Sequence, residues 1–182
     1  MLTTIDNLLV EAVINLRSGW LTDFFLGASS WGDPRSVAFI LVVVIFVFTL
    51  TRRYFEALVI LLGTLLAWSS QYLLKIVIAR ARPDGPNLLV EVTGYSFPSG
   101  HAAVTTTLLL LIGHYLCQIK IIQPYRSLVY LLAIFLSLVV AFSRVYLGAH
   151  WPSDIIAGYI LGIVIWGLFV WLFPKVGLKS KS

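Results

Sequence analysis

The sequence predicts an all-α protein, a polytopic bundle of transmembrane helices that forms one domain over residues 1–182. Two observations carry this prediction. Of the residues, 59% are hydrophobic and only 12% are charged, whereas roughly a quarter of the residues in ordinary soluble domains are charged. Five apolar stretches also approach the ~20 residues that a helix needs to cross a bilayer. Lipid, rather than a water-soluble core, is therefore expected to solvate most of the apolar surface.

The N-terminal segment, residues 1–33, is apolar but interrupted by Glu11, Arg17 and Asp23. Apolar residues recur at helical spacing at positions 8, 9, 13 and 16, which is typical of an amphipathic helix that lies in the membrane interface. We expect five spans plus this interfacial segment. A sixth span is the alternative, but it would place three charges near the bilayer centre.

Five spans follow this segment. The first ends before Arg52 and Arg53, and the others are bounded by prolines or polar loops. A GxxxG spacing, Gly158 and Gly162, lies in the last span, where we interpret it as packing within the bundle rather than as a dimer contact. The expected spans are roughly residues 35–50, 55–78, 102–116, 128–142 and 155–173.

The distribution of basic residues predicts the orientation. The segments after the first, third and fifth spans carry basic residues and no acidic ones, and with alternating helices they share one face. Lysine and arginine are retained on the cytoplasmic side, so that face is expected to be cytoplasmic. The basic residues are Arg52, Arg53, Lys120, Arg126, Lys175, Lys179 and Lys181. We expect an integral protein of the cell (inner) membrane, with no cleaved leader.

Composition also limits the partners and cofactors. The net charge is +5, but no basic run is interleaved with aromatics, so nucleic acid is not an expected partner. Cys117 is the only cysteine, which excludes an intramolecular disulfide and favours a small buried side chain. No metal-ligand spacing occurs, so we expect neither a metal nor another cofactor. Membrane lipids are expected to surround the protein, and the oligomeric state stays open.

Another set of charged or titratable residues, from three separate segments, gathers at the non-cytoplasmic ends of the spans, where a charge is costly and calls for an explanation. Lys75 lies near the outer end of the second span, and Arg82 follows seven residues later. Pro83 disfavours helix at Arg82, so the chain is expected to bend and return this guanidinium toward Lys75. Arg80, between them, is expected to contact the interface or a headgroup.

Two further segments reach the same face. Pro98-Ser99-Gly100-His101 precedes the third span: Ser99 can cap that helix, and a helix N-terminus favours an anion. Arg144 ends the fourth span, and His150 and Asp154 follow at the start of the fifth. A carboxylate four residues from a histidine can orient its ring and make it a better base or nucleophile. His114 lies deep in the third span and is expected to join two helices.

These three segments, over residues 75–154, resemble the type 2 phosphatidic acid phosphatase family of membrane lipid phosphatases. The family signature is Lys-x6-Arg-Pro, then Pro-Ser-Gly-His, then Ser-Arg-x5-His-x3-Asp. Every specified position is matched in order, by Lys75, Arg82, Pro83, Pro98 to His101, Ser143, Arg144, His150 and Asp154. The family usually has six spans, so the chain departs from it only at the N-terminus.

The resemblance implies a role for each matched residue. His150 is expected to attack phosphorus and form a phosphohistidine, Asp154 to orient His150, and His101 to protonate the leaving group. Lys75, Arg82, Ser99, Gly100 and Arg144 are expected to bind the phosphoryl oxygens. Fixed cations suit this chemistry because phosphoryl transfer depends on positioning and on stabilising negative charge.

The substrate is expected to be the phosphate monoester or diphosphate of a lipid: phosphatidylglycerol phosphate, phosphatidic acid or a polyprenyl diphosphate. Polyprenyl diphosphate phosphatases often have an acidic residue at the position of Gly100, so the resemblance leans toward glycerophospholipids. A vanadium haloperoxidase has a similar anion pocket, but those proteins are soluble. A lipid transporter or a non-catalytic lipid-phosphate-binding protein is the alternative of a different class, and the paired histidines favour catalysis over it.

Overall fold

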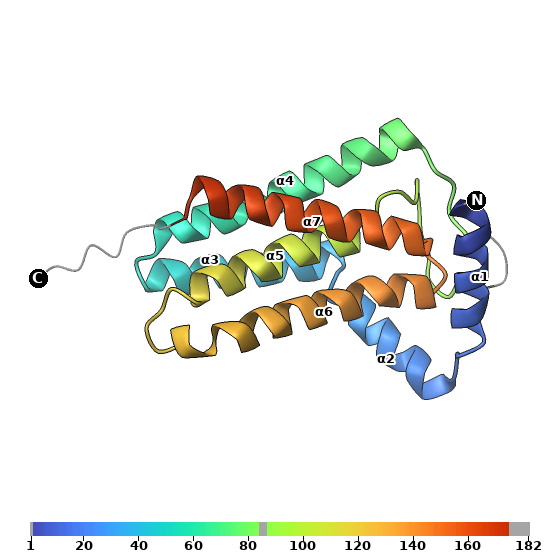
Figure 1. The fold of residues 1–182 in the computed structure, drawn as a ribbon, viewed down its shortest axis with the longest axis horizontal. Coiled ribbons are helices and arrows are strands. Elements are labelled where there is room, and N and C mark those ends of the chain that lie inside the picture. Colours follow the sequence, from blue (N-terminus) through green and yellow to red (C-terminus); the bar gives the residue numbers. More distant parts are fainter. Residues whose placement is uncertain (1, 84–86, 175–182) are drawn as a thin grey trace, which may run out of the picture.

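The structure is a computed structural model that describes residues 2–83 and 87–174, and these residues form helices joined by turns and loops (Figure 1). Five helices run along the long axis of the molecule and coincide with the five predicted stretches to within a few residues. Their bounds are α3 (Pro34–Leu50), α4 (Tyr54–Ile78), α5 (Gly100–Leu116), α6 (Arg126–Tyr146) and α7 (Pro152–Leu172). The all-α prediction is therefore confirmed.

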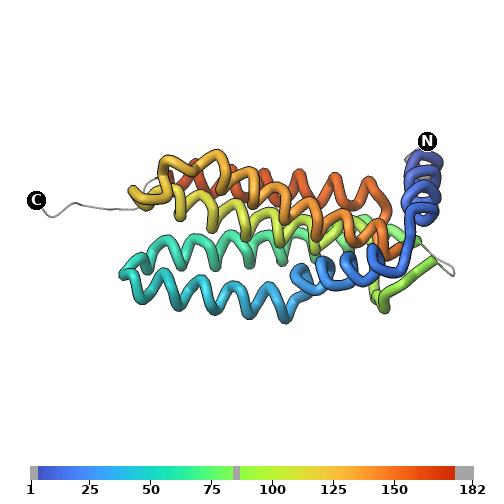
Figure 2. Tube along the Cα trace, turned by 90° about the horizontal axis from the view of Figure 1, so that it is seen from below, coloured from blue at the N-terminus to red at the C-terminus, as the bar shows by residue number. Residues whose placement is uncertain are grey.

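The N-terminal segment differs from the single interfacial helix that the sequence indicated. It forms two helices, α1 (Leu2–Ile14) and α2 (Gly19–Ser30). Helix α1 lies across one end of the bundle (Figures 1 and 2), while α2 packs against α6 and bends by 55° into α3. The break between the two helices lies at residues 31–33, directly before Pro34. Aromatic packing joins α2 to α6, since the Phe25 and Tyr146 ring centroids are 4.5 Å apart.

Helix α5 is the centre of the bundle and contacts α4, α6 and α7. Glycines allow α7 to approach it closely. A Cβ atom at Gly158 would lie 2.5 Å from the carbonyl oxygen of Ser99, and one at Gly162 would lie 2.7 Å from that of Ala103. The interpretation of this GxxxG spacing as packing within the bundle is confirmed.

The outer surface of the bundle is apolar. Phe39, Val77 and Trp171 are at least 70% exposed, as expected where lipid rather than water is the solvent. Three helices, α4, α6 with the short 3-10 helix before it, and α7, are long and apolar enough to cross a membrane; α2 and α3 together can form a fourth, bent span. Helix α5 is apolar but shorter. The membrane bundle is confirmed, and the number of five spans stays a prediction.

The two ends of the bundle differ in the charges they carry. At one end, the turns before α4 and before α6 carry exposed basic side chains, Arg52, Lys120 and Arg126. Arg53 is less free than the sequence suggested, because its Nε donates to Glu56 Oε1 at 2.8 Å. The tail lysines at 175, 179 and 181 lie outside the described residues. The motif-bearing loops and α1 occupy the opposite end (Figure 1).

Candidate active site

The end of α4 and the turn after it bring Lys75 and Arg82 to the same cavity. Ala79 ends the helix in the left-handed conformation, with φ of 49°, so the chain turns before it reaches Arg82. The expected bend is confirmed, although it occurs at Ala79 and not next to Pro83. Lys75 Nζ donates to the carbonyl oxygens of Tyr95 at 2.8 Å and Ser96 at 3.2 Å. These bonds anchor the following loop to the helix.

The Arg82 guanidinium is fixed by backbone carbonyls on three of its nitrogens. Nε donates to Gly94, Nη2 to Thr93 and Nη1 to Ala149, over 2.7 to 3.0 Å. The same Nη1 lies 3.4 Å from Nε2 of His150. A cation held this firmly is preorganised to receive an anion next to that ring nitrogen.

Asp154 holds His150 from the side opposite Arg82. The distance from His150 Nδ1 to Asp154 Oδ2 is 3.4 Å, and both side chains are buried. With its proton on Nδ1, toward the carboxylate, the ring presents the lone pair of Nε2 to the cavity. Burial lowers the pKa of His150 to about 3; the hydrogen bond to Asp154 opposes this shift, and Arg82, Lys75 and Arg144 add to it. The imidazole is therefore neutral at physiological pH and able to act as a nucleophile.

The start of α5 presents His101 to the same cavity. Ser99 caps the helix, because its hydroxyl accepts from the backbone N–H of Ala102 at 3.4 Å, as the sequence predicted. His101 Nε2 lies 3.1 Å from Oδ1 of Asp33, which precedes α3. The chain can pass this close to the ring because residue 32 is glycine: a Cβ there would overlap the His101 imidazole.

Arg144 lies near the end of α6 and is buried. Its Nη1 donates to Ser29 Oγ at 2.5 Å, whereas its Nε has no partner among the described residues. Gln71 Oε1, on the facing wall, is also buried without a partner in that part of the chain. Buried polar groups are nearly always satisfied, so these two atoms are candidates to bind a polar ligand in the space between them.

These side chains surround a cavity of about 150 Å³. Six motif residues line it: Lys75, Arg82, Gly100, His101, Arg144 and His150. Ser99 and Asp154 are fully buried behind this wall, where one caps α5 and the other holds His150. The structure thus brings together residues from α4, α5, α6 and the loops between them, all at the end of the bundle opposite the basic turns.

Three side chains at the site were not among the predicted site residues. Gln71 lies four residues before Lys75, on the same face of α4, whereas Ser29 and Asp33 had no signal in the sequence. Asp33 contacts His101, Ser29 contacts Arg144, and Gln71 faces Gly100, where a Cβ would lie 2.9 Å from the amide oxygen. Ser29 and Asp33 belong to the segment that was expected to lie in the interface. No spacing rule connects positions 29 and 33 with residues more than sixty positions away, so only the fold could identify them.

Arg80 also differs from expectation. Instead of reaching a headgroup, its guanidinium joins two carboxylates: Nη1 lies 2.6 Å from Asp154 Oδ1 and Nη2 lies 2.6 Å from Asp6 Oδ2. His114 behaves as predicted, since its Nδ1 lies 3.0 Å from the Tyr130 hydroxyl and joins α5 to α6. Within the described ranges, no three His, Cys, Asp or Glu side chains cluster as metal ligands.

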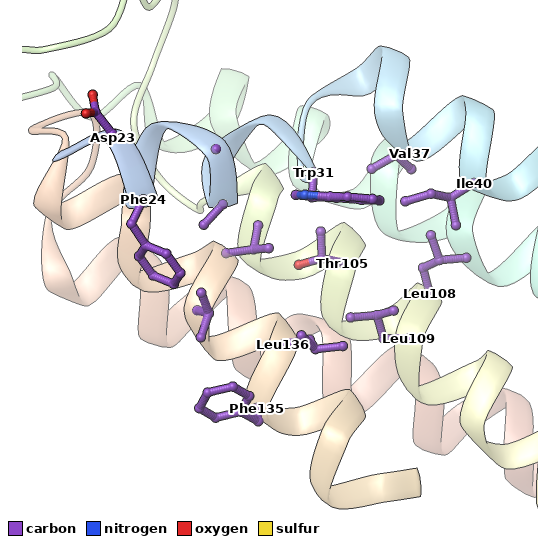
Figure 3. A pocket seen from close by; sticks show the side chains of 14 residues that line it. Asp23, Phe24, Trp31, Val37, Ile40, Thr105, Leu108, Leu109, Phe135 and Leu136 are labelled. Atoms are coloured by element: carbon purple, nitrogen blue, oxygen red, sulfur yellow. The ribbon is translucent and has the colours of Figure 1, made fainter. Parts of the chain in front are cut away.

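An apolar groove lies beside the polar cavity. It has a volume of about 660 Å³, and its walls come from α2, α3, α5 and α6 (Figure 3). Phe24, Trp31, Leu108 and Leu136 are among its lining residues. Val37 lines both the groove and the polar cavity. An amphipathic ligand could therefore place an apolar chain in one space and an anionic group in the other.

Comparison with known proteins agrees with this arrangement. The model of the PAP2 superfamily matches residues 56–178. Phosphatidylglycerophosphatase B of Bacillus subtilis is 27% identical over 164 residues, covering 90% of this chain and 80% of that protein. Decaprenylphosphoryl-5-phosphoribose phosphatase of Mycobacterium tuberculosis (strain H37Rv) is 32% identical over 142 residues, covering 76% and 73%.

A solved structure is also similar. The crystal structure of a transmembrane PAP2-type phosphatidylglycerolphosphate phosphatase from Bacillus subtilis superposes with a TM-score of 0.92 at 26% identity. The superposition covers 98% of this chain and 89% of that one. The N-terminal helices of the present chain thus fall within the matched region.

Proposed function

The chain belongs to the PAP2 superfamily and is a membrane lipid phosphatase, and from this premise we propose that it removes the terminal phosphate of a glycerophospholipid through a phosphohistidine on His150. One observation carries the proposal: a small cavity holds three cations and a neutral, carboxylate-oriented histidine, while Arg144 Nε in its wall has no partner in the described part of the chain. A phosphoryl group would supply the missing acceptor.

In the first step, the Nε2 lone pair of His150 attacks phosphorus and forms the N–P bond. The bond from phosphorus to the lipid oxygen breaks, and His101 gives that oxygen its proton. Lys75, Arg82 and Arg144 stabilise the negative charge on the equatorial oxygens. Gly100 allows backbone N–H groups at the start of α5 to approach the same anion. Asp154 stabilises the cationic ring that forms.

In the second step, water attacks the phosphohistidine. His101, now deprotonated, takes a proton from the water, and the N–P bond breaks to release inorganic phosphate. Both histidines return to their starting protonation states, so the cycle is complete. Ser99, which caps α5, supports the phosphate site through the helix N-terminus rather than from the cavity wall.

The groove in Figure 3 suits the apolar part of the substrate. It is lined almost entirely by hydrophobic side chains and meets the polar cavity at Val37. A diacylglycerol chain placed there leaves the phosphate at His150. Because lipid tails and anionic headgroups have opposite solvation, two adjoining spaces of opposite polarity select for a lipid phosphate over a water-soluble ester.

A glycerophospholipid phosphate is the favoured substrate for two reasons. The Bacillus subtilis relatives are named for phosphatidylglycerol phosphate, and Gly100 replaces the acidic residue often found in polyprenyl diphosphate phosphatases. Gln71 also faces Gly100 closely, so a larger side chain there would have to displace the Gln71 amide. The mycobacterial relative is named for a polyprenyl lipid, which makes polyprenyl phosphates the necessary comparison.

The site faces the non-cytoplasmic side of the cell membrane in this proposal, with α3 to α7 as five spans and α1 in the interface. The exposed Arg52, Lys120 and Arg126 at the opposite end support this orientation, because basic turns are retained in the cytoplasm. The apolar outer face of α1, where Ile5 is 51% exposed and Leu8 62%, supports its place at the bilayer surface.

The proposal is tested by phosphate release from purified protein in mixed micelles. The panel contains phosphatidylglycerol phosphate, phosphatidic acid, undecaprenyl phosphate and undecaprenyl diphosphate. We expect turnover of the glycerophospholipids to exceed that of the polyprenyl lipids. His150→Ala should lower kcat by at least about a thousandfold, because no group remains to accept the phosphoryl. His114→Ala, which removes a helix contact away from the cavity, is the matched control and should keep near-normal activity.

Two results would contradict the proposal. Near-normal hydrolysis by a folded His150→Ala protein would exclude this histidine as the nucleophile. Tight binding of the lipids without phosphate release by the unmodified protein would instead identify a transporter or a binding protein.

A further inference from the structure

The side chain of Arg80 lies behind the catalytic wall and links two carboxylates that are far apart in the sequence. Nη1 donates to Asp154 Oδ1 at 2.6 Å and to the Ser153 hydroxyl at 2.7 Å, and Nη2 donates to Asp6 Oδ2 at 2.6 Å. Asp154 is completely buried and Asp6 is 2% exposed. We call this group, Asp6, Arg80, Ser153 and Asp154, the arginine bridge.

The two carboxylate oxygens of Asp154 have different partners. Oδ1 accepts from Arg80, while Oδ2 accepts from the backbone N–H of Trp151 at 3.0 Å and faces His150 Nδ1. The Arg80 guanidinium also lies over the Trp151 ring, 5.5 Å from its centroid. Because both oxygens have fixed partners, the plane of the carboxylate is defined, and so is the direction from which it holds the imidazole.

Asp6 is the outer half of the bridge and the main polar attachment of α1. In addition to Arg80, it accepts from the Ser153 backbone N–H at 3.0 Å and from the Ser153 hydroxyl at 2.6 Å. Ser153 lies in the first turn of α7, where a helix stabilises an anion. Burial raises the pKa of Asp6, but the hydrogen bonds from Ser153 and Arg80 outweigh it and leave the pKa below its usual value.

These contacts connect the membrane surface to the nucleophile. Helix α1 exposes an apolar face on one side and places Asp6 against the start of α7 on the other. We propose that Arg80 and Asp6 are positioning residues for the reaction: acting through Asp154, they fix the orientation of the His150 ring, and docked α1 is thereby part of the catalytic apparatus. This inference rests on the proposed role of His150.

The chemistry explains why arginine suits the position. A planar guanidinium can donate to two carboxylates at once, whereas the lysine ammonium is a point charge on a flexible stem. Arg80→Lys should keep one contact and lose the fixed geometry. Asp6→Asn keeps the size of the side chain but removes the charge that holds Nη2. Both changes leave Lys75, Arg82 and Arg144, and hence the anion cavity, untouched.

A matched control separates positioning from simple attachment of α1. Arg17 also ties the N-terminal helices to the bundle, since its Nε donates to the carbonyl oxygen of Tyr146 at 3.0 Å. It has no contact with Asp154. Arg17→Gln therefore weakens the attachment without touching the bridge.

The experiment measures kcat, KM and inhibition by vanadate for Asp6→Asn, Arg80→Lys and Arg17→Gln in mixed micelles, with phosphatidylglycerol phosphate as substrate. Outer partners that orient a reactive histidine commonly contribute 10- to 100-fold in metal sites, so we expect kcat to fall about tenfold in Asp6→Asn and Arg80→Lys. KM and the vanadate inhibition constant should change by less than about twofold. Arg17→Gln should resemble the unmodified protein.

The inference is overturned if Asp6→Asn and Arg80→Lys keep the original kcat, if the loss appears in KM or vanadate affinity instead, or if Arg17→Gln loses as much activity as they do. Failure of the proposed function is distinguishable, because the unmodified protein would then release no phosphate from the lipid.

Discussion

His101 and His150 each contact a carboxylate, but the two pairs are built differently. Asp154 is fully buried and lies four residues from His150 on the chain, whereas the Asp33 side chain is 51% exposed and lies 68 positions from His101. The buried pair suits a nucleophile that must keep one orientation. The pair of His101 and the more exposed Asp33 suits an acid that must regain its proton from water during each cycle.

The contact between Asp33 and His101 leads to a prediction about a single residue. Asp33→Asn keeps a side chain of similar shape against His101 but removes the charge that orients the imidazole. We expect kcat to fall about tenfold, within the range that general acid catalysis contributes, with little change in KM. Steady-state phosphate release measures both constants.

Glu11→Gln provides the control, because this exposed carboxylate lies on α1 and contacts no motif residue among the described hydrogen bonds. If Asp33→Asn and Glu11→Gln have the same kcat, the contact between Asp33 and His101 has no catalytic importance.

The three cations predict metal-independent turnover. Lys75, Arg82 and Arg144 bring positive charge to the phosphoryl site, as Mg²⁺ does in other phosphoryl-transfer enzymes. Activity should survive exhaustive treatment with EDTA and should be inhibited by vanadate, which can mimic the phosphoryl transition state. Phosphate release is measured with and without chelator. Loss of activity that Mg²⁺ alone restores would show that turnover depends on a metal and would contradict the prediction.

At the scale of the helices, the contact between α5 and α7 determines how well the site is assembled. Ser99 N donates to the carbonyl oxygen of Asp154 at 3.0 Å, so the beginnings of the two helices are joined directly. Gly158 allows this approach, because a Cβ there would press against the Ser99 carbonyl oxygen. Packing in this part of the bundle therefore positions both the cap of α5 and the carboxylate that holds His150.

Gly158→Ala should separate the two helices. We expect a loss of about 1 to 3 kcal/mol of stability from overpacking, together with lower activity, because the obstructing atom belongs to the backbone. Thermal unfolding in detergent and phosphate release report the two effects. Gly167→Ala, in the same helix with open space around the added methyl group, should be neutral or slightly stabilising. Equal unfolding temperatures for the two variants would exclude close packing as the reason for glycine at 158.

At the scale of the whole molecule, the chemistry and the exposed basic turns lie at opposite ends of the bundle. Their separation predicts the orientation in the membrane. Asn87 is exposed in the loop at the site end, and Gln123 is exposed in the turn before α6 at the other end. In a Cys117→Ser background, a membrane-impermeant thiol reagent added to intact cells should label Asn87→Cys and spare Gln123→Cys.

Permeabilised cells provide the control for this labelling, since both cysteines should then react. Labelling of position 123 alone in intact cells would place the phosphatase site in the cytoplasm.

The helices and the residues that carry the chemistry can be predicted from the amino-acid sequence. Apolar stretches near the thickness of a bilayer form helices because the backbone has no other partner in lipid, and α3 to α7 follow them closely. The motif residues lie next to helix ends, so short spacings such as His150 to Asp154 already imply contact. The sequence therefore predicts that the motif residues lining the cavity lie close together.

The distant side chains that support the site are identified by the packing of the helices and not by the sequence. The contacts of Asp33 with His101, of Ser29 with Arg144 and of Arg80 with Asp6 join residues that no local pattern connects. Each depends on how the helices are rotated about their axes, and the contacts of Ser29 and Asp33 lie on either side of the 55° bend between α2 and α3. The single helix expected over residues 1–33 is instead two helices, and α2 packs against α6. Hydrophobic periodicity shows that a face is apolar, but packing decides whether lipid or another helix covers it.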